Sequence, residues 1–224
     1  MSADQVISGT AINMIAGAIT IFMARNMTGS GNIRVSGFTS FDIPGLEKIP
    51  ILGPLFFRNS YLTTWLVLFI LVISYIVLYK TAFGMRLRAC GEHPHAAEAA
   101  GVRVKRMRYI GVMVSGAFAG LGGAIIILTY AAEFTGSVSG LGFLALAALI
   151  FGQWRPFGIL GATLFFGFAT TVANVSQVIP SLAVIPPIIL KVFPYVVTLL
   201  ALIAFSKSSR APKAVGEPYD VGKR

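Results

Sequence analysis

The chain has 224 residues, of which 56% are hydrophobic and only 12% are charged, and its mean hydropathy is +0.81. A soluble domain carries about 25% charged residues, so this composition excludes a soluble globular protein. The formal net charge of +10 could suggest nucleic acid binding, but the basic residues gather beside apolar stretches, which argues against that partner.

Several apolar stretches are long enough to cross a bilayer. A hydrocarbon core of about 30 Å needs about 20 apolar residues in a helix. Backbone groups at that depth cannot bond to water, so such stretches must be helical, and the sequence lacks the alternating pattern of a membrane β-barrel. The sequence predicts an all-α fold, a polytopic transmembrane bundle with about six crossings within residues 1–206.

The first predicted crossing, residues 6–24, is unusually polar for a membrane helix. Its polar side chains include Ser8, Thr10, Asn13 and Thr20. A loop over residues 25–60 follows, which is rich in glycine, proline and aromatic residues. The second crossing, residues 61–79, is Leu-rich and β-branched, with tyrosine and tryptophan near its ends, where aromatic side chains anchor helices at the membrane interface.

A basic segment, residues 80–108, separates the second crossing from the third at 109–132. Seven of the 18 basic residues lie in this segment: Lys80, Arg86, Arg88, Arg103, Lys105, Arg106 and Arg108. Five more lie in the tail, residues 207–224: Lys207, Arg210, Lys213, Lys223 and Arg224. Because loops rich in lysine and arginine stay in the cytoplasm, we expect both segments there, with the tail disordered.

The third crossing is rich in small residues, which favours close helix packing over a substrate groove. The next apolar segment, residues 141–151, is too short to cross a bilayer unaided at about 1.5 Å per residue. The last two crossings are predicted at 157–178 and 186–205. Only if 141–151 also crosses do both basic segments share one side, so we expect it to be a short crossing helix buried among its neighbours.

Residues 94–101, inside the basic segment, predict a helix of about two turns. Pro94 suits the first turn, four alanines favour the helix, and Gly101 suits the position after the last turn. The small side chains would let a partner approach the backbone closely. From residue chemistry alone, two interpretations remain open: a surface connector, or a coupling helix that transmits motion from a cytoplasmic motor.

Three segments carry a family resemblance. Residues 86–102 follow the pattern Arg-x-Arg-Ala-x-Gly-x-x-Pro-x-Ala-Ala-x-x-Ala-Gly-Val, and residues 140–147 and 151–158 form a second signature. In this order they resemble the permeases of bacterial ABC importers for branched-chain amino acids, ribose-type sugars and nucleosides. The loop at residues 43–54 is similar to the nucleoside branch, which is associated with basic-membrane-protein lipoproteins.

The resemblance implies a helical fold of the vitamin B12-importer type in the plasma (inner) membrane. It implies three kinds of protein partner: a cytoplasmic ATP-binding subunit, a second permease subunit that is identical or different, and an extracytoplasmic substrate-binding lipoprotein. This chain would bind no cofactor, and the partner ATPase would use ATP and Mg²⁺. Because family members have further helices before the segment matching Val6, we expect the chain to lack the N-terminal helices.

The resemblance also implies that the helix after Pro94 contacts the ATP-binding subunit. The residues expected in this contact are Glu92, Pro94, His95, Ala96, Ala97, Glu98, Ala100 and Gly101. Polar groups at membrane depth suggest Asn13 and Asn174 for the translocation pathway, with Phe134 near the outer mouth to stack on a flat ligand. Amides in membrane helices more often bond to a neighbouring helix.

No catalytic or metal-binding pattern stands out in the sequence. His93 and His95 are two residues apart, whereas helical metal ligands are four apart. A lone cysteine, Cys90, allows no disulfide framework within the chain. A glycine-rich phosphate loop ending in Lys-Ser or Lys-Thr is missing from the sequence, so we expect a transport subunit, not an enzyme, with ATP hydrolysed by another chain.

The leading hypothesis is therefore a permease subunit of an ABC importer that moves nucleosides or related small polar solutes by alternating access. The same type of complex for simple sugars or branched-chain amino acids is an alternative. Alternatives of another class are a membrane-embedded lipid-modifying enzyme and a secondary transporter or channel, which would work without an ATPase partner.

Overall fold

The computed structural model describes residues 5–41, 59–138, 140–175, 211–217 and 219, together with positions 188, 189, 192 and 196. The described part of the chain is mostly helical. The chain divides into two compact units, the first formed by residues 1–138 and 213–224 and the second by residues 139–212. The predicted sixth crossing, residues 186–205, lies almost wholly outside the described residues.

Three helices of the first unit are long and apolar enough to cross a membrane. They are α1 (Gln5–Thr28), α2 (Leu62–Lys80) and α5 (Val104–Ile126), which continues as a π-helical turn, η2 (Ile127–Ala131). Their positions match the first three predicted crossings. Helix α5 begins five residues earlier than predicted, because its basic first turns are helical too, and long Lys and Arg side chains can keep their charges in water.

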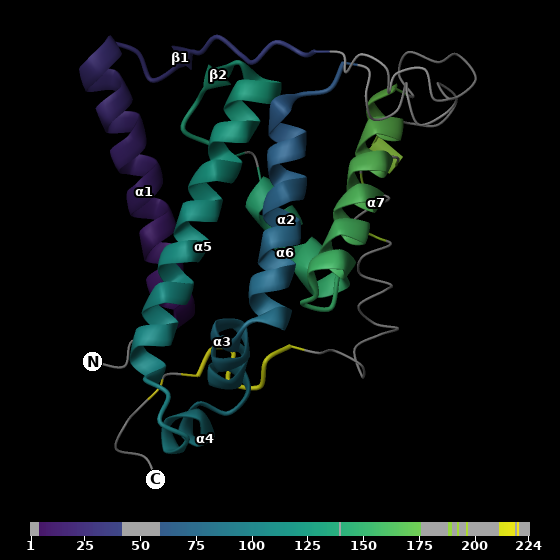
Figure 1. Ribbon diagram of the computed structural model, residues 1–224. Coiled ribbons are helices and arrows are strands. Elements are labelled where there is room, and N and C mark those ends of the chain that lie inside the picture. The colour runs from purple at the N-terminus through teal and green to yellow at the C-terminus, as the bar shows by residue number, and fades with distance from the viewer. Residues whose placement is uncertain are drawn as a thin grey trace, which may run out of the picture. The chain divides into compact units, whose positions relative to one another are not determined.

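Two short strands join the far ends of α1 and α5. Strand β1 (Ile33–Arg34) pairs antiparallel with β2 (Glu133–Phe134), with Ile33 opposite Phe134. The N–H of Phe38 also donates to the carbonyl of Leu128 in η2, at 2.9 Å. Since β1 follows α1 and β2 follows η2, α1 and α5 run parallel, as Figure 1 shows.

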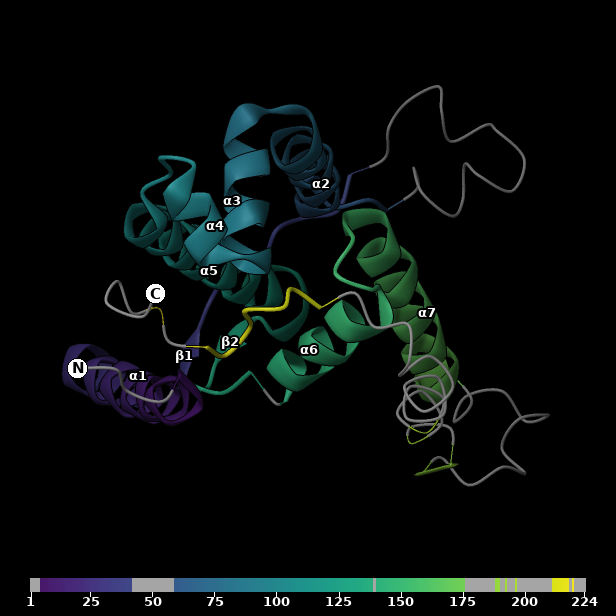
Figure 2. The ribbon, with the colours of Figure 1, turned by 90° about the horizontal axis from the view of Figure 1, so that it is seen from below.

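Two further helices, α3 (Ala82–Glu92) and α4 (Pro94–Ala99), connect α2 to α5 at the opposite end of these helices from the strands. We call them together the elbow (residues 82–99). Figure 2 shows α3 lying between the ends of α2 and α5, and it contacts both. The sequence predicted the second of these helices but missed the first.

The second unit contains a helical hairpin of α6 (Leu141–Phe151) and α7 (Pro156–Val175). Its buried core consists of Ala148, Ala162 and Phe166. The bounds of α6 are those of the predicted short apolar segment; at 11 residues it spans about 16 Å, so its crossing of the membrane stays a prediction. Gln153 and Trp154, in the turn between the helices, both have a left-handed backbone, with φ of 54° and 58°.

Candidate functional site

The elbow begins at a tight corner after α2. The hydroxyl of Thr81 donates to the carbonyl of Val77 at 2.6 Å and accepts from the N–H of Gly84 at 3.2 Å, which caps α3. A Cβ atom on Gly84 would overlap the carbonyl oxygens of Val77 and Leu78. Only glycine therefore lets the first turn of α3 lie this close to the end of α2.

Helix α4 has well-defined ends. His93 separates it from α3, and Pro94 occupies the first turn, where a missing N–H costs nothing. After its last turn, the N–H of Gly101 donates to the Glu98 carbonyl at 2.8 Å and the N–H of Val102 to the Ala97 carbonyl at 3.0 Å. Gly101 has a φ of +82°, which completes a Schellman motif. The predicted short helix is thus present, one turn and a half long.

A small hydrophobic core holds the elbow against α5. Its buried residues are Cys90, Ala97, Val104 and Met107, and Leu87, Val102 and Tyr219 pack against them. Burial raises the pKa of the Cys90 thiol, an effect that the nearby Arg108 partly offsets. Raising this pKa keeps the thiol protonated and unreactive, so Cys90 acts as a small apolar filler.

The C-terminal tail lies against the elbow. The N–H of Ala214 donates to the carbonyl of Gly91 at 3.0 Å, and Nη1 of Arg108 donates to the carbonyl of Glu217 at 3.0 Å. The Tyr219 ring contacts one side chain of the elbow, His95, and one of α5, Arg108. Its centroid is 5.3 Å from that of His95 and 5.5 Å from the guanidinium carbon of Arg108.

The Tyr219 hydroxyl is shielded from solvent and makes no well-formed hydrogen bond with any described residue. It lies near the Glu98 carboxylate, whose interaction with it, together with partial burial, raises the pKa of Tyr219 to about 12. A raised pKa keeps the hydroxyl neutral beside a negative charge. The phenol therefore contributes its ring, not a charge, to the contact with α4.

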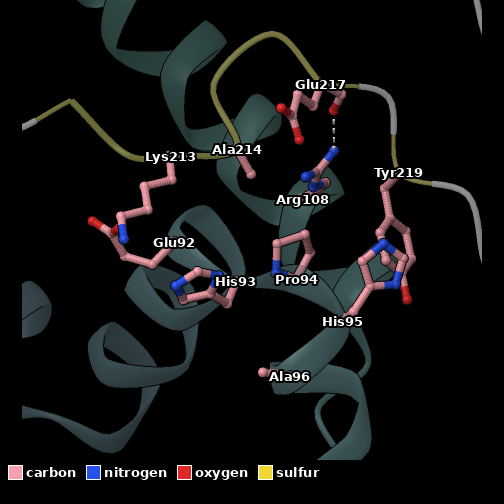
Figure 3. A pocket seen from close by; sticks show the side chains of 10 residues that line it. All are labelled: Glu92, His93, Pro94, His95, Ala96, Arg108, Lys213, Ala214, Glu217 and Tyr219. Atoms are coloured by element: carbon pink, nitrogen blue, oxygen red, sulfur yellow. Dashed lines mark hydrogen bonds between the residues drawn. The ribbon is translucent and has the colours of Figure 1, made fainter. Parts of the chain in front are cut away.

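The tail, the elbow and Arg108 of α5 line a pocket of about 300 Å³ (Figure 3). Its lining residues are Glu92, His93, Pro94, His95, Ala96, Arg108, Lys213, Ala214, Glu217 and Tyr219. The side chains of Lys213 and Glu92 point toward each other at one end of the pocket, and Arg108 and Tyr219 lie at the other. The site thus combines positively and negatively charged side chains from segments more than 100 residues apart in sequence.

The residues expected to contact an ATP-binding subunit all lie in this one region. Glu92, His95, Ala96, Glu98, Ala100 and Gly101 are exposed, and Pro94 is half-buried. Ala97 differs from the others, because it points into the core and is only 5% exposed. It holds α4 in place and does not contribute to the exposed surface.

The expected pathway residues are not brought together by any described contact. Asn13 is an exposed residue of α1, and Phe134 is a half-buried residue of β2. Asn174 belongs to the last turn of α7 in the other unit, and its side chain lies outside the described residues. Their role in a pathway stays a prediction.

Sequence reasoning missed the contribution of α3 and of the tail. The sequence places Arg108 in the basic segment and Ala214, Glu217 and Tyr219 in the tail, but nothing in it links the two segments. One signal was available, since Tyr219 is an isolated aromatic residue in a polar tail, and such a side chain often docks on a folded surface. Across the described ranges, no three histidine, cysteine or acidic side chains cluster as metal ligands would.

The chain is similar to known permease proteins over nearly its whole length. The model of the family described as the branched-chain amino acid transport system / permease component matches residues 1–202. The chain is 47% identical to the guanosine ABC transporter permease protein NupQ of Bacillus subtilis over 99% of its length and 70% of the relative's. It is 38% identical to the nucleoside ABC transporter permease protein NupC of Lactococcus lactis, over 98% of the chain and 70% of that relative.

A more distant relative is named for a sugar. The chain is 31% identical to a putative glucose ABC transporter permease protein of Haloferax volcanii, over 90% of the chain and 67% of the relative. No solved structure matches the chain significantly.

Proposed function

The chain belongs to the permease-component family of the branched-chain amino acid transport system, and from that premise we propose that it is the membrane-spanning subunit of an ABC importer for nucleosides. It is a transport component and not an enzyme. The observation that carries the substrate class is the similarity, over nearly the whole chain, to relatives named for guanosine and for nucleosides. The relative named for glucose is less similar, which supports nucleosides over sugars.

We propose that the protein crosses the plasma membrane several times, in a bundle of about six crossings of the vitamin B12-importer type. The three long apolar helices support this arrangement. The contact between Ala214 and Gly91 supports it too, because the tail and the elbow must then lie on the same side of the membrane. Lysine and arginine are concentrated in both, so that side is the cytoplasm.

The elbow is the proposed docking site for the ATP-binding subunit, which hydrolyses ATP with Mg²⁺. Ala97 packs helix α4 against the core. Ala96, Ala99 and Ala100 are exposed, and their small side chains leave the backbone of this segment accessible. Movement of the docked subunit would be transmitted to the long helices α2 and α5, because α3 contacts both of them. A second permease subunit and an extracytoplasmic binding lipoprotein would complete the importer.

Reconstitution tests the function. The protein is placed in proteoliposomes with its ATP-binding subunit and binding lipoprotein, and uptake of labelled guanosine, glucose and leucine is measured with and without ATP. We expect ATP-dependent uptake of guanosine that exceeds uptake of the other two. Guanosine uptake that proceeds equally without the ATP-binding subunit would favour a secondary transporter and contradict the proposal.

Variants of the exposed face of α4 test the docking site. Ala99→Leu adds bulk on that face, and Glu98→Lys reverses a charge beside it. We expect both to lower substrate-stimulated ATP hydrolysis while the protein still inserts into the membrane. Ala97 is unsuitable for this purpose, because a larger side chain there would disrupt the buried core and not the docking surface alone.

A further inference from the structure

The tail meets the elbow through contacts of three different kinds. Ala214 donates a backbone hydrogen bond to Gly91, Arg108 donates a side-chain hydrogen bond to Glu217, and the Tyr219 ring packs on His95 and Arg108. These contacts are spread over six residues of the tail, from Ala214 to Tyr219, so they hold a segment and not a single side chain. Figure 2 shows this segment, in yellow, passing beside the elbow.

Helix α4 presents three faces, since successive residues of a helix are turned by about 100°. Ala97 faces the core. His95 and Glu98, three residues apart, share a second face, and it is this face that Tyr219 approaches. The third face, with Ala96, Ala99 and Ala100, is exposed with the tail in place. The tail therefore contacts one side of α4 through Tyr219 and leaves the proposed docking face open.

Helix α4 needs such lateral support. It has six residues, whereas an isolated helix shorter than about 12 residues is marginal in water. Ala97 is its one buried residue, and it offers a single methyl group to the core. The Tyr219 ring is the largest of the side chains that pack on that core from outside. Without it, α4 would be held by its two ends and by the contact of Ala97 with the core.

Resting on the proposed function, we propose that residues 213–217 together with Tyr219 clamp α4 and complete the surface on which the ATP-binding subunit docks, with Tyr219 as the positioning residue. The pocket of about 300 Å³ supports this assignment, because the tail and the elbow each supply part of its wall and Ala96 joins it to the open face of α4. A subunit seated on that face would therefore contact both segments. The clamp stiffens α4, so that force on the helix moves α3 and α5 and does not bend α4.

Substitution of Tyr219 in the full complex tests the clamp. Tyr219→Ala removes both ring contacts, and we expect roughly tenfold weaker binding of the ATP-binding subunit and fewer nucleosides moved per ATP hydrolysed. Tyr219→Phe keeps the ring, so it should restore both quantities to near the wild-type values. Tyr219→Phe also serves as the matched control, since it differs from the wild type only in the hydroxyl group.

A distance measurement tests whether Tyr219 positions the tail against α4 or whether its substitution merely destabilises the protein. Spin labels on Ala99→Cys and Val215→Cys, both exposed positions, report the distance between α4 and the tail, while the buried Cys90 stays unlabelled. We expect a narrow distance distribution in the otherwise unchanged protein and a broad one after Tyr219→Ala. A broad distribution before any change at Tyr219 would show that the tail is not docked, and would overturn the proposal.

The outcomes also distinguish the clamp from the proposed function. If the wild-type protein fails to bind its ATP-binding subunit, the proposed function fails. If the wild type binds and couples but Tyr219→Ala does so equally well, the clamp alone is wrong. Tighter binding or faster ATP hydrolysis after Tyr219→Ala would make the tail an inhibitor of docking, which also contradicts the clamp.

Discussion

Gly152 and Gly158 touch through their backbones: a Cβ atom on Gly158 would overlap the carbonyl oxygen of Gly152. Gly152 ends α6 and Gly158 lies in the first turn of α7, so this contact determines how closely the hairpin closes. The turn between the two glycines is also tight. Gln153 and Trp154 in this turn have a left-handed backbone, which residues other than glycine rarely adopt.

Gly158→Val should therefore force α6 and α7 apart. Overpacking of this kind costs about 1–3 kcal/mol, which we expect to lower the melting temperature of the detergent-solubilised protein. Gly161→Ala is the matched control in the same helix, because a Cβ atom there meets no atom within 4 Å. Equal melting temperatures for the two variants would contradict the contact.

Gly84→Ala should damage the corner between α2 and α3. The added methyl group would overlap backbone atoms of Val77 and Leu78, which cannot move aside as a flexible side chain would. We expect a loss of about 1–3 kcal/mol in stability and weaker binding of the ATP-binding subunit, measured on the purified complex. Gly111→Ala in α5, where the new methyl group makes only an ordinary contact with Leu87, should change neither.

Substitutions of Gly101 test the Schellman motif that ends α4. Its φ of +82° is unfavourable for an L-amino acid by about 1–2 kcal/mol, so Gly101→Ala should loosen the Schellman motif and raise hydrogen exchange at the Val102 amide. Gly101→Asn should have a smaller effect, since asparagine tolerates this conformation better. The order of exchange rates, alanine above asparagine above glycine, checks the prediction, and any other order contradicts it.

Thr63 and Thr129 share a hydroxyl hydrogen bond of 3.3 Å between α2 and η2. Thr63→Val removes it and leaves the Thr129 hydroxyl without this partner. Bonds of this kind between membrane helices contribute about 0.6 kcal/mol, so we expect a small but measurable fall in thermal stability. Thr64→Val, at the exposed neighbouring position, should have no comparable effect.

The raised pKa of Tyr219 predicts how docking of the tail depends on pH. The interaction with Glu98 and partial burial raise this pKa from 10 to about 12, so the docked tail holds the proton more tightly than the free tail. Docking is therefore at full strength below pH 10 and weakens as the pH rises through about 12. A tyrosinate absorbance titration of the wild type minus that of Tyr219→Phe should show a single step near pH 12.

Glu98→Gln supplies the control for that titration. It removes the negative charge of Glu98 from beside the phenol, so the step in the difference curve should move toward pH 10. A step that stays in place after this change would mean that Glu98 does not act on Tyr219.

Local patterns predicted much of the fold. The bounds of α6 and the positions of α1, α2 and α5 follow from runs of apolar residues, and the α4 helix follows from Pro94, its alanines and Gly101. The first helix of the elbow was missed because α3 mixes arginine, glycine and apolar residues without a clear helical period. Its position depends on the close approach of Gly84 to the end of α2, which no local pattern reveals.

Local patterns also explain which part of the candidate region stood out in the sequence. The residues around Pro94 were identified by a contiguous motif, but the inward orientation of Ala97 and the tail contacts were not. Length and hydrophobicity are properties of a stretch of chain, so the amino-acid sequence by itself determined that this protein has helices long and apolar enough to cross a membrane and a short helix in a basic loop. Only the tertiary structure decided that Arg108 and His95 meet Tyr219, because such contacts form where the folded chain brings distant segments together, and the chain between Arg108 and Glu217 spans 109 positions.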